Sequence, residues 1–284
     1  MTGREEQPTP VREGPLRRPR AGPGYDIRPF PVVRRAYADG LALAQRQHTI
    51  HGLVEADIDR ARPLLRDGRD ASGDPLSLTA WVAACVARAV EEHPTVHAHR
   101  WGRGTLVLFD DVDVSVQVDH VLTDGSHAVR SRVLRAANRR TVAELSAQVH
   151  DARSGGADDG RRLRATLALA RLPAPVRRAV MRGVVARPFL SKRLAGTVMV
   201  TSVGMFGSGL GWGIPVSPAP LSVTVGGIGP RPGLVDGRLV ERDHLSLTVS
   251  VDHDLVDGAL AARFTERLRE LVEGAFGLPG GVTA

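Results

Sequence analysis

Two histidines in this chain each stand four residues ahead of an Asp-Gly pair. Residues 118–125 read VDHVLTDG and residues 251–258 read VDHDLVDG, so the pattern singles out His120 and His253. An unperturbed histidine titrates near pH ~6.5 and can therefore accept a proton at neutral pH. The aspartate can fix the following loop through hydrogen bonds, and the glycine permits a positive φ where the chain turns. The pattern alone does not separate a general base from a structural histidine.

The two copies differ in the residues on their C-terminal side. The second copy ends an alternating strand and leads directly into a helical pattern in which Leu260, Phe264 and Leu268 share one face. Asp257 would stand at the start of that helix and favour it electrostatically. The first copy is followed by SHAVRSRV, which predicts more extended chain. Physical reasoning therefore favours the second copy without settling the choice.

The elements that must position these residues alternate between helical and strand patterns. Such an order predicts an α/β fold with a mixed sheet covered by helices. Ser77 is a candidate N-cap for the clearest helix, which Pro94 ends. The expected helices cover 32–47, 59–65, 77–93 and 141–153, with two short helices in 161–195, and the expected strands lie in 48–59, 105–120, 196–229 and 245–252.

The composition limits the class of partner. The chain has 284 residues, a formal net charge of +7 and 42% hydrophobic residues, which suits one large globular domain or two small ones. The basic residues are dispersed and aromatic residues make up only 4%, so we expect an anionic small partner and no nucleic acid. No apolar run reaches the ~18 residues of a membrane span. Cys85, the single cysteine, lies in an apolar stretch and indicates a small core residue and a cytoplasmic protein.

Several segments resemble one known family. SVDHDLVDGALAARF (250–264) resembles the active-site signature of the catalytic domain of dihydrolipoamide acyltransferases, the E2 components of 2-oxoacid dehydrogenase complexes. Chloramphenicol acetyltransferases are similar to that family and share the signature. GTVMVTSVGMFG (196–207) resembles a second segment of the family, and residues 32–59 and 76–98 resemble its opening helix, strand and next helix. The resemblance covers roughly residues 32–276 in the family's order.

The resemblance implies roles for single residues. His253 becomes the catalytic base, Thr201 the hydroxyl that binds the oxyanion, and Asp257 the residue that shapes the loop of the base. By the same alignment His120 falls in an extended segment near the substrate channel, so the first copy of the pattern is a coincidence. The expected supporting residues are Ser202, Gly204 and Gly258. The segment from Gly204 to Gly207 would hold the strand and loop against the site. No metal ligand is expected.

The resemblance also implies the architecture and the co-substrate. We expect a chloramphenicol acetyltransferase-like two-layer sandwich over residues 31–284, after a disordered N-terminal arm at residues 1–30. The co-substrate would be acyl-coenzyme A, and the active sites would lie between the subunits of a homotrimer. Residues 1–30 contain no lysine, so no covalently bound lipoyl group is expected on this chain. The acceptor is then either a lipoyl group supplied by another protein or the hydroxyl of a small molecule.

Some residues depart from the family pattern. Asp254 follows the histidine where the family usually has arginine, and Ser202 stands where the family has asparagine. SHAVRSRV replaces the family's Gly-Leu-x-x-Pro-Val, and the basic segment 161–187 is longer than the family needs. These departures keep an alternative open, a catalytically silent protein that retains the trimeric core and binds partners.

Overall fold

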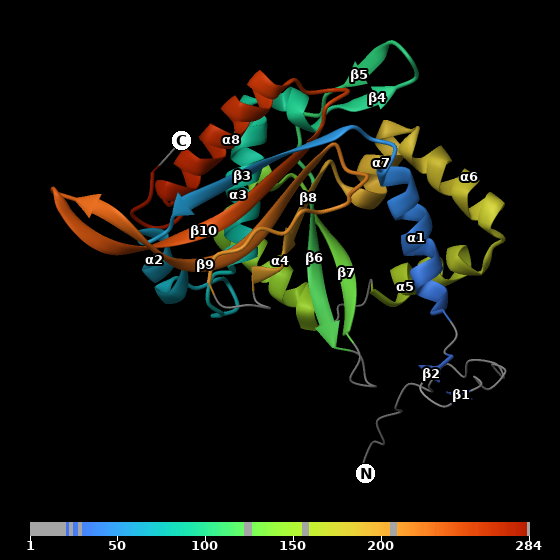
Figure 1. The fold of residues 1–284 in the computed structure, drawn as a ribbon, viewed down its shortest axis with the longest axis horizontal. Helices are drawn as coiled ribbons and strands as arrows, with labels where there is room; N and C mark the ends of the chain where they lie inside the picture. Colours follow the sequence, from blue (N-terminus) through green and yellow to red (C-terminus); the bar gives the residue numbers. More distant parts are fainter. Residues whose placement is uncertain are drawn as a thin grey trace.

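A six-stranded mixed β-sheet forms the centre of the protein (Figure 1). The strand order is β3-β10-β9-β8-β6-β7, with β8 parallel to both of its neighbours and the other pairs antiparallel. The strands are β3 (Thr49–Asp57), β6 (Val114–Val121), β7 (His127–Leu134), β8 (Val198–Ser202), β9 (Leu221–Val235) and β10 (Arg238–Asp252). The computed structural model describes residues 21–22, 25–27, 30–121, 127–154, 159–204 and 209–282.

One face of the sheet is apolar and covered by helices. Valine and leucine at every second position of β9 and β10 point to this face, because side chains alternate along a strand. They form one core with the central helix, whose Trp81 is fully buried and donates its indole N–H to the carbonyl of Phe276. The helices on this side are α2 (Ala61–Asp67), α3 (Leu78–Glu92), α4 (Val142–Ser154) and α8 (Gly258–Glu273).

A second group of helices gathers beside the β7 edge, at the right of Figure 1. The buried carboxylate of Asp39 accepts hydrogen bonds from Arg177 and Arg178 and so joins the first helix to the third of the group. These two guanidinium groups lower the pKa of Asp39 and offset the cost of its burial. The group consists of α1 (Val32–Ala44), α5 (Asp159–Arg171), α6 (Ala174–Val185) and α7 (Pro188–Ala195).

Short elements complete the fold. The hairpin of β4 and β5 lies near the start of α8, and β9 and β10 continue beyond the sheet as a two-stranded ribbon, at the left of Figure 1. These elements are β1 (Ala21–Gly22), β2 (Tyr25–Asp26), β4 (His99–Trp101), β5 (Thr105–Val107) and the 3₁₀ turns η1 (Pro94–His97) and η2 (Ala137–Arg139). Among the described residues, no helix is both long and apolar enough to cross a bilayer.

Most expected elements are present, and two expectations are wrong. Ser77 caps α3 as expected, and its hydroxyl accepts a hydrogen bond from the amide of Ala80. The expected strand at 105–120 is two strands in different sheets, because the chain leaves β5 and enters the central sheet only at Val114. Segment 161–195 lies in three helices rather than two, since α5 extends to Arg171 before the prolines begin. Residues 1–20 of the expected arm lie outside the described residues.

Candidate functional site

His253 lies in the turn that joins β10 to α8. Its backbone N–H donates a hydrogen bond of 2.8 Å to the carbonyl of His48, the residue before β3. The amides of Leu255 and Val256 both donate to the carbonyl of Asp252, and these bonds close the turn. The side chain of His253 is exposed. The turn therefore presents the imidazole at the end of the sheet, where a proton acceptor for a bound substrate could act.

Asp257 is the N-cap of α8. Its carboxylate accepts a hydrogen bond of 2.7 Å from the amide of Leu260, which satisfies one of the free N–H groups at the helix start. This is the position at the start of the helix that the sequence predicts for Asp257. Gly258 differs from expectation, because it is the first helical residue, has no positive φ and has open space around it. The structure therefore gives no steric reason for a glycine at position 258.

Asp254 connects the turn of His253 to two other elements. Its carboxylate forms an ion pair of 2.9 Å with Nδ1 of His48 and lies 3.8 Å from the guanidinium of Arg100 on β4. The hydrogen bond from His48 lowers the pKa of Asp254, and the same bond raises the pKa of His48. The carboxylate that follows His253 is thus paired with the ring of His48 and the guanidinium of Arg100, both from outside the turn.

Thr201 lies on β8, on the face of the sheet opposite the helices. Its neighbours across the sheet are Thr224 on β9 and, beyond it, Thr248 on β10. The hydroxyls of Thr224 and Thr248 are buried without a hydrogen-bond partner among the described residues, whereas Thr201 is only half-buried. Of the three threonines, Thr201 is therefore the one that is partly exposed.

The segment after β8 is held tightly against β9. The amide of Val203 donates to the carbonyl of Val225, and a Cβ on Gly204 would lie 1.9 Å from the carbonyl oxygen of Gly226. Only glycine fits at position 204, because a real Cβ cannot approach an oxygen so closely. Ser202 is half-buried at the end of the strand. Gly207, the other glycine expected to hold this loop, lies outside the described residues.

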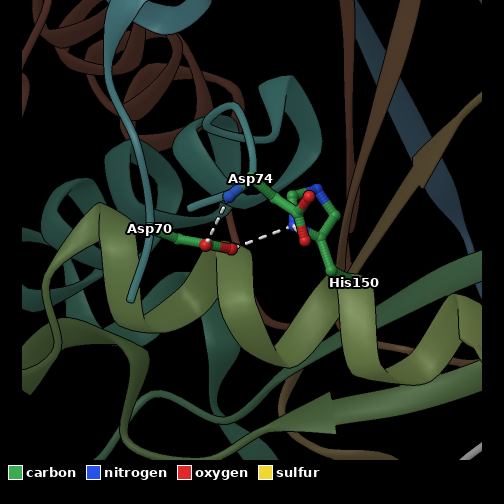
Figure 2. A group of neighbouring side chains, drawn as sticks. All are labelled: Asp70, Asp74 and His150. Carbon is green, nitrogen blue, oxygen red and sulfur yellow. Dashed lines mark hydrogen bonds and ion pairs between the residues drawn. The ribbon is translucent and has the colours of Figure 1, made fainter. Parts of the chain in front are cut away.

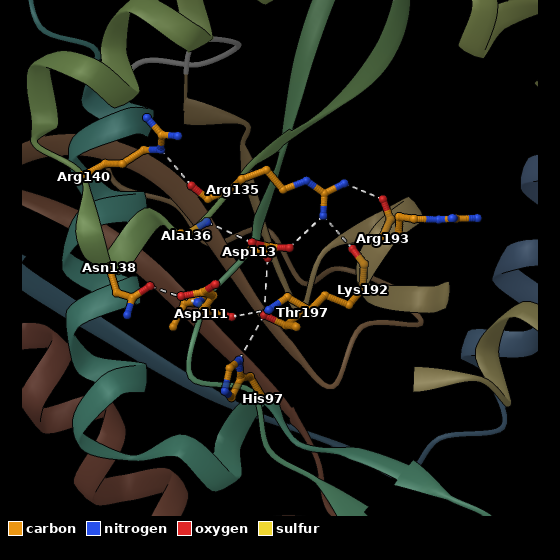
Figure 3. A network of polar contacts seen from close by, with 11 residues as sticks. His97, Asp111, Asp113, Arg135, Ala136, Asn138, Arg140, Lys192, Arg193 and Thr197 are labelled. Carbon is orange, nitrogen blue, oxygen red and sulfur yellow. Dashed lines mark hydrogen bonds and ion pairs between the residues drawn. The ribbon is translucent and has the colours of Figure 1, made fainter. Parts of the chain in front are cut away.

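The start of β8 is fixed by Asp113, a residue that sequence reasoning did not single out (Figure 3). Its carbonyl accepts hydrogen bonds from the amides of Thr197 and Val198, and its carboxylate accepts bonds from Arg135 and from the amide of Ala136. The guanidinium of Arg135 also donates to carbonyls at the end of α7. Asp113 thus anchors the strand that carries Thr201. The only sequence signal is an aspartate just before an alternating strand.

A cavity of about 1030 Å³ opens at the far end of β8. It is lined by Ser202 and Gly204 and by Ser77 and Thr79 at the start of α3. His150 of α4 lies on its wall. The described residues that line it include Ser202 but not Thr201, whose side chain lies on the other face of the sheet.

Asp70, Asp74 and His150 form a polar cluster beside this cavity (Figure 2). Asp70 accepts a hydrogen bond from the His150 ring and two more from the amides of Ser72 and Asp74. Burial opposes the ionised form of Asp70, but these three bonds together lower its pKa. These hydrogen bonds hold the three side chains in their positions and connect the loop after α2 to α4.

Thr201 and His253 do not meet within one chain. Thr201 is level with Thr248 two strands away, and His253 lies five residues further on, just past the end of β10. With strands ~4.8 Å apart and ~3.4 Å per residue, the two Cα atoms are about 20 Å apart. Residues 122–126 lie outside the described residues, and with them Asp124 and Gly125 of the first motif. The side chain of His120 is likewise outside the described part of the chain, so its expected lack of a role stays a prediction.

The chain belongs to the family described as 2-oxoacid dehydrogenases acyltransferase (catalytic domain), whose model matches residues 23–161 and 191–278. The lipoamide acyltransferase component of the branched-chain alpha-keto acid dehydrogenase complex from Bacillus subtilis is 25% identical over 259 residues. The match covers 86% of this chain and 51% of that protein, so this chain spans about half the length of that relative. The family model does not match residues 162–190, which hold most of the basic segment 161–187.

Solved structures show the same fold. A probable dihydrolipoamide acetyltransferase from Listeria monocytogenes has a TM-score of 0.65 and 22% identity, with 90% of this chain and 97% of that chain covered. The dihydrolipoamide acetyltransferase of Azotobacter vinelandii has a TM-score of 0.62 and 22% identity, with 87% and 91% covered. The expected fold class, a mixed sheet with covering helices, is therefore confirmed, and so is the expected acyltransferase family.

Proposed function

We propose that this chain is a coenzyme A-dependent acyltransferase in which His253 is the general base and Thr201 the oxyanion donor. The spacing of three residues carries the proposal. Thr201 precedes His253 by 52 positions and Asp257 follows it by four. The Azotobacter vinelandii structure belongs to an investigation of a serine, a histidine and an asparagine in the catalytic mechanism, and those three residues are also 52 and four positions apart. Threonine retains the hydroxyl of serine, and aspartate retains a capping oxygen.

The proposed reaction transfers an acyl group from the thioester of coenzyme A to a thiol or hydroxyl. His253 removes the proton of the acceptor, whose sulfur or oxygen then attacks the thioester carbonyl. The carbonyl oxygen becomes an oxyanion, to which the hydroxyl of Thr201 donates a hydrogen bond. The intermediate expels the thiolate of coenzyme A, and His253 returns its proton to that sulfur. Asp257 supports the turn as the cap of α8 and takes no proton.

The separation of Thr201 and His253 supports an active site between subunits. A gap of about 20 Å is too wide for both side chains of one chain to reach the same carbonyl carbon. A second copy must then bring its Thr201 to the His253 of the first. A ring with one such interface repeated around it closes as a cyclic oligomer, and we propose the homotrimer expected from the family resemblance.

The acceptor is proposed to be a dihydrolipoyl group supplied by another protein or a small-molecule hydroxyl. The test mixes the protein with acetyl-coenzyme A and, in turn, dihydrolipoamide and a panel of alcohols. Free coenzyme A is followed by chromatography, because dihydrolipoamide carries thiols of its own. We expect acceptor-dependent release of coenzyme A. The proposed compartment is the cytoplasm, which the single buried thiol of Cys85 favours.

The histidine variants decide the assignment of the base. His253→Ala should abolish transfer while leaving the fold and the oligomer intact, because only the proton acceptor is removed. His120→Ala should keep most of the turnover. Equal turnover in wild type and His253→Ala would remove His253 from the mechanism, and a comparable loss in His120→Ala would move the base to the first motif. If the wild-type protein releases no coenzyme A with any acceptor of the panel, the scaffold alternative is favoured.

A further inference from the structure

Three elements converge on the carboxylate of Asp254. The residue itself belongs to the turn after β10, His48 precedes β3, and Arg100 lies on β4. The carboxylate is 2.9 Å from Nδ1 of His48 and 3.8 Å from the guanidinium of Arg100. His48 also accepts the backbone N–H of His253 through its carbonyl at 2.8 Å. His48 therefore holds two consecutive residues of the turn, one through its main chain and one through its ring.

These contacts add little to the stability of the fold. The side chains of Asp254, His48 and Arg100 are 42%, 78% and 55% exposed, and ion pairs at such exposure stabilise a protein only slightly. The strands that flank the turn are already joined by a regular antiparallel ladder from Thr49 to Asp57. The contacts restrain the short stretch that follows the last paired residues of the two strands, Asp252 and Thr49, and this stretch contains His253.

We propose that Asp254 and His48 are positioning residues that hold the imidazole of His253 in place for proton transfer. The proposal rests on the proposed function of His253. Transfer rates fall steeply when a base is displaced by a fraction of an ångström to an ångström from its acceptor proton. Bonds within the turn, from the amides of Asp254, Leu255 and Val256 to Asp252, give it its shape. The two bonds to His48, one from the His253 amide and one to the Asp254 carboxylate, tie the turn to the start of β3.

The charges around the turn set the pH range of this arrangement. The carboxylate of Asp254 faces His48, Arg100 and His253. The amide of Asp254 donates to the carboxylate of Asp252, whose pKa is raised by burial. Hydrogen bonding lowers the pKa of Asp254 and raises that of His48, which widens the pH range over which both groups are charged. The charged pair is lost as pH rises through the raised pKa of His48 or falls through the lowered pKa of Asp254.

The experiment compares Asp254→Asn, His48→Ala and His48→Gln in the full-length protein. Asn and Ala remove the ion pair, whereas Gln retains an N–H donor for the carboxylate. We expect Asp254→Asn and His48→Ala to lower kcat by about ten- to a hundredfold with little change in KM, and His48→Gln to recover most of the loss. Glu55→Gln is the matched control, because it removes a carboxylate of β3 that pairs with Arg231 of β9, away from the turn.

A second measurement does not depend on turnover. Hydrogen exchange of the His253 amide reports the bond to the His48 carbonyl directly. Asp254→Asn and His48→Ala should speed this exchange at least about tenfold, and Glu55→Gln should not change it.

Each outcome bears on one claim. Unchanged exchange and turnover within twofold in Asp254→Asn, with His253→Ala inactive, would overturn the positioning role and leave the proposed function standing. Full activity in His253→Ala would instead remove the proposed function. A loss confined to KM would mean that Asp254 contacts substrate, and complete inactivity of both His48 variants would make His48 itself the proton carrier. Either result overturns the positioning role.

Discussion

At the scale of single residues, the hydroxyl of Thr201 is distinguished from its neighbours by exposure rather than by type. Three threonines cross β8, β9 and β10 in register, and two of them have buried hydroxyls with no partner in the described part of the chain. A buried hydroxyl without a partner costs free energy, so the row is not built for stability. The half-buried Thr201 at its end can direct its O–H outward to a substrate.

Replacing Thr201 should therefore affect chemistry and not folding. Thr201→Val removes the hydroxyl at nearly constant volume and should lower kcat by about a hundredfold or more, the usual effect of losing an oxyanion donor. Thr201→Ser should keep most of the activity. Thr224→Val is the matched control, since it removes a buried, unpartnered hydroxyl from the same row and should leave turnover nearly unchanged. Steady-state kinetics would reject the donor role if Thr201→Val stayed within twofold of wild type.

At the scale of elements, the sequence predicted those helix and strand ends that depend on interactions between residues close together in the chain. The cap at Ser77, the proline after the helix and the alternation before His253 all act within a few residues, and α3, β10 and α8 lie where these signals put them. Asp113 could not be predicted in the same way, because its partners Thr197 and Val198 are more than eighty positions away. The same holds for the contacts of Asp254, whose partners His48 and Arg100 come from other parts of the chain.

The cap of α8 gives a prediction that separates shape from charge. Asp257→Ala removes the hydrogen bond to the Leu260 amide and should destabilise the fold by about 1 kcal/mol. Asp257→Asn keeps a capping oxygen without the charge, and Asn caps helices about as well as Asp. We expect Asp257→Asn to retain stability and turnover. Thermal unfolding and kinetics measure both, and a strong loss of turnover in Asp257→Asn at normal stability would assign the charge itself a part in the reaction.

At the scale of the whole molecule, the sheet that carries both proposed reactive groups also keeps them apart. Thr201 is near the end of β8 and His253 follows the end of β10; because these two strands run in opposite directions, the two residues lie toward opposite ends of the strands. No rearrangement of side chains closes about 20 Å within a packed sheet. A symmetric assembly can bring the two groups together. An interface between two different patches of the same chain would place the Thr201 end of one sheet beside the His253 end of the sheet in the neighbouring subunit.

Mixing two inactive variants tests this arrangement. Thr201→Val and His253→Ala subunits, assembled together at equal amounts, would form interfaces in which an intact His253 faces an intact Thr201 at random. About a quarter of the sites should then be native, so the mixture should recover about a quarter of the wild-type activity. His253→Ala mixed with the double variant contains no intact His253 and should recover none. If the first mixture stays as inactive as its parents while mixed oligomers are present by mass, each site uses residues of one chain, and the separation seen along the sheet must close by another route.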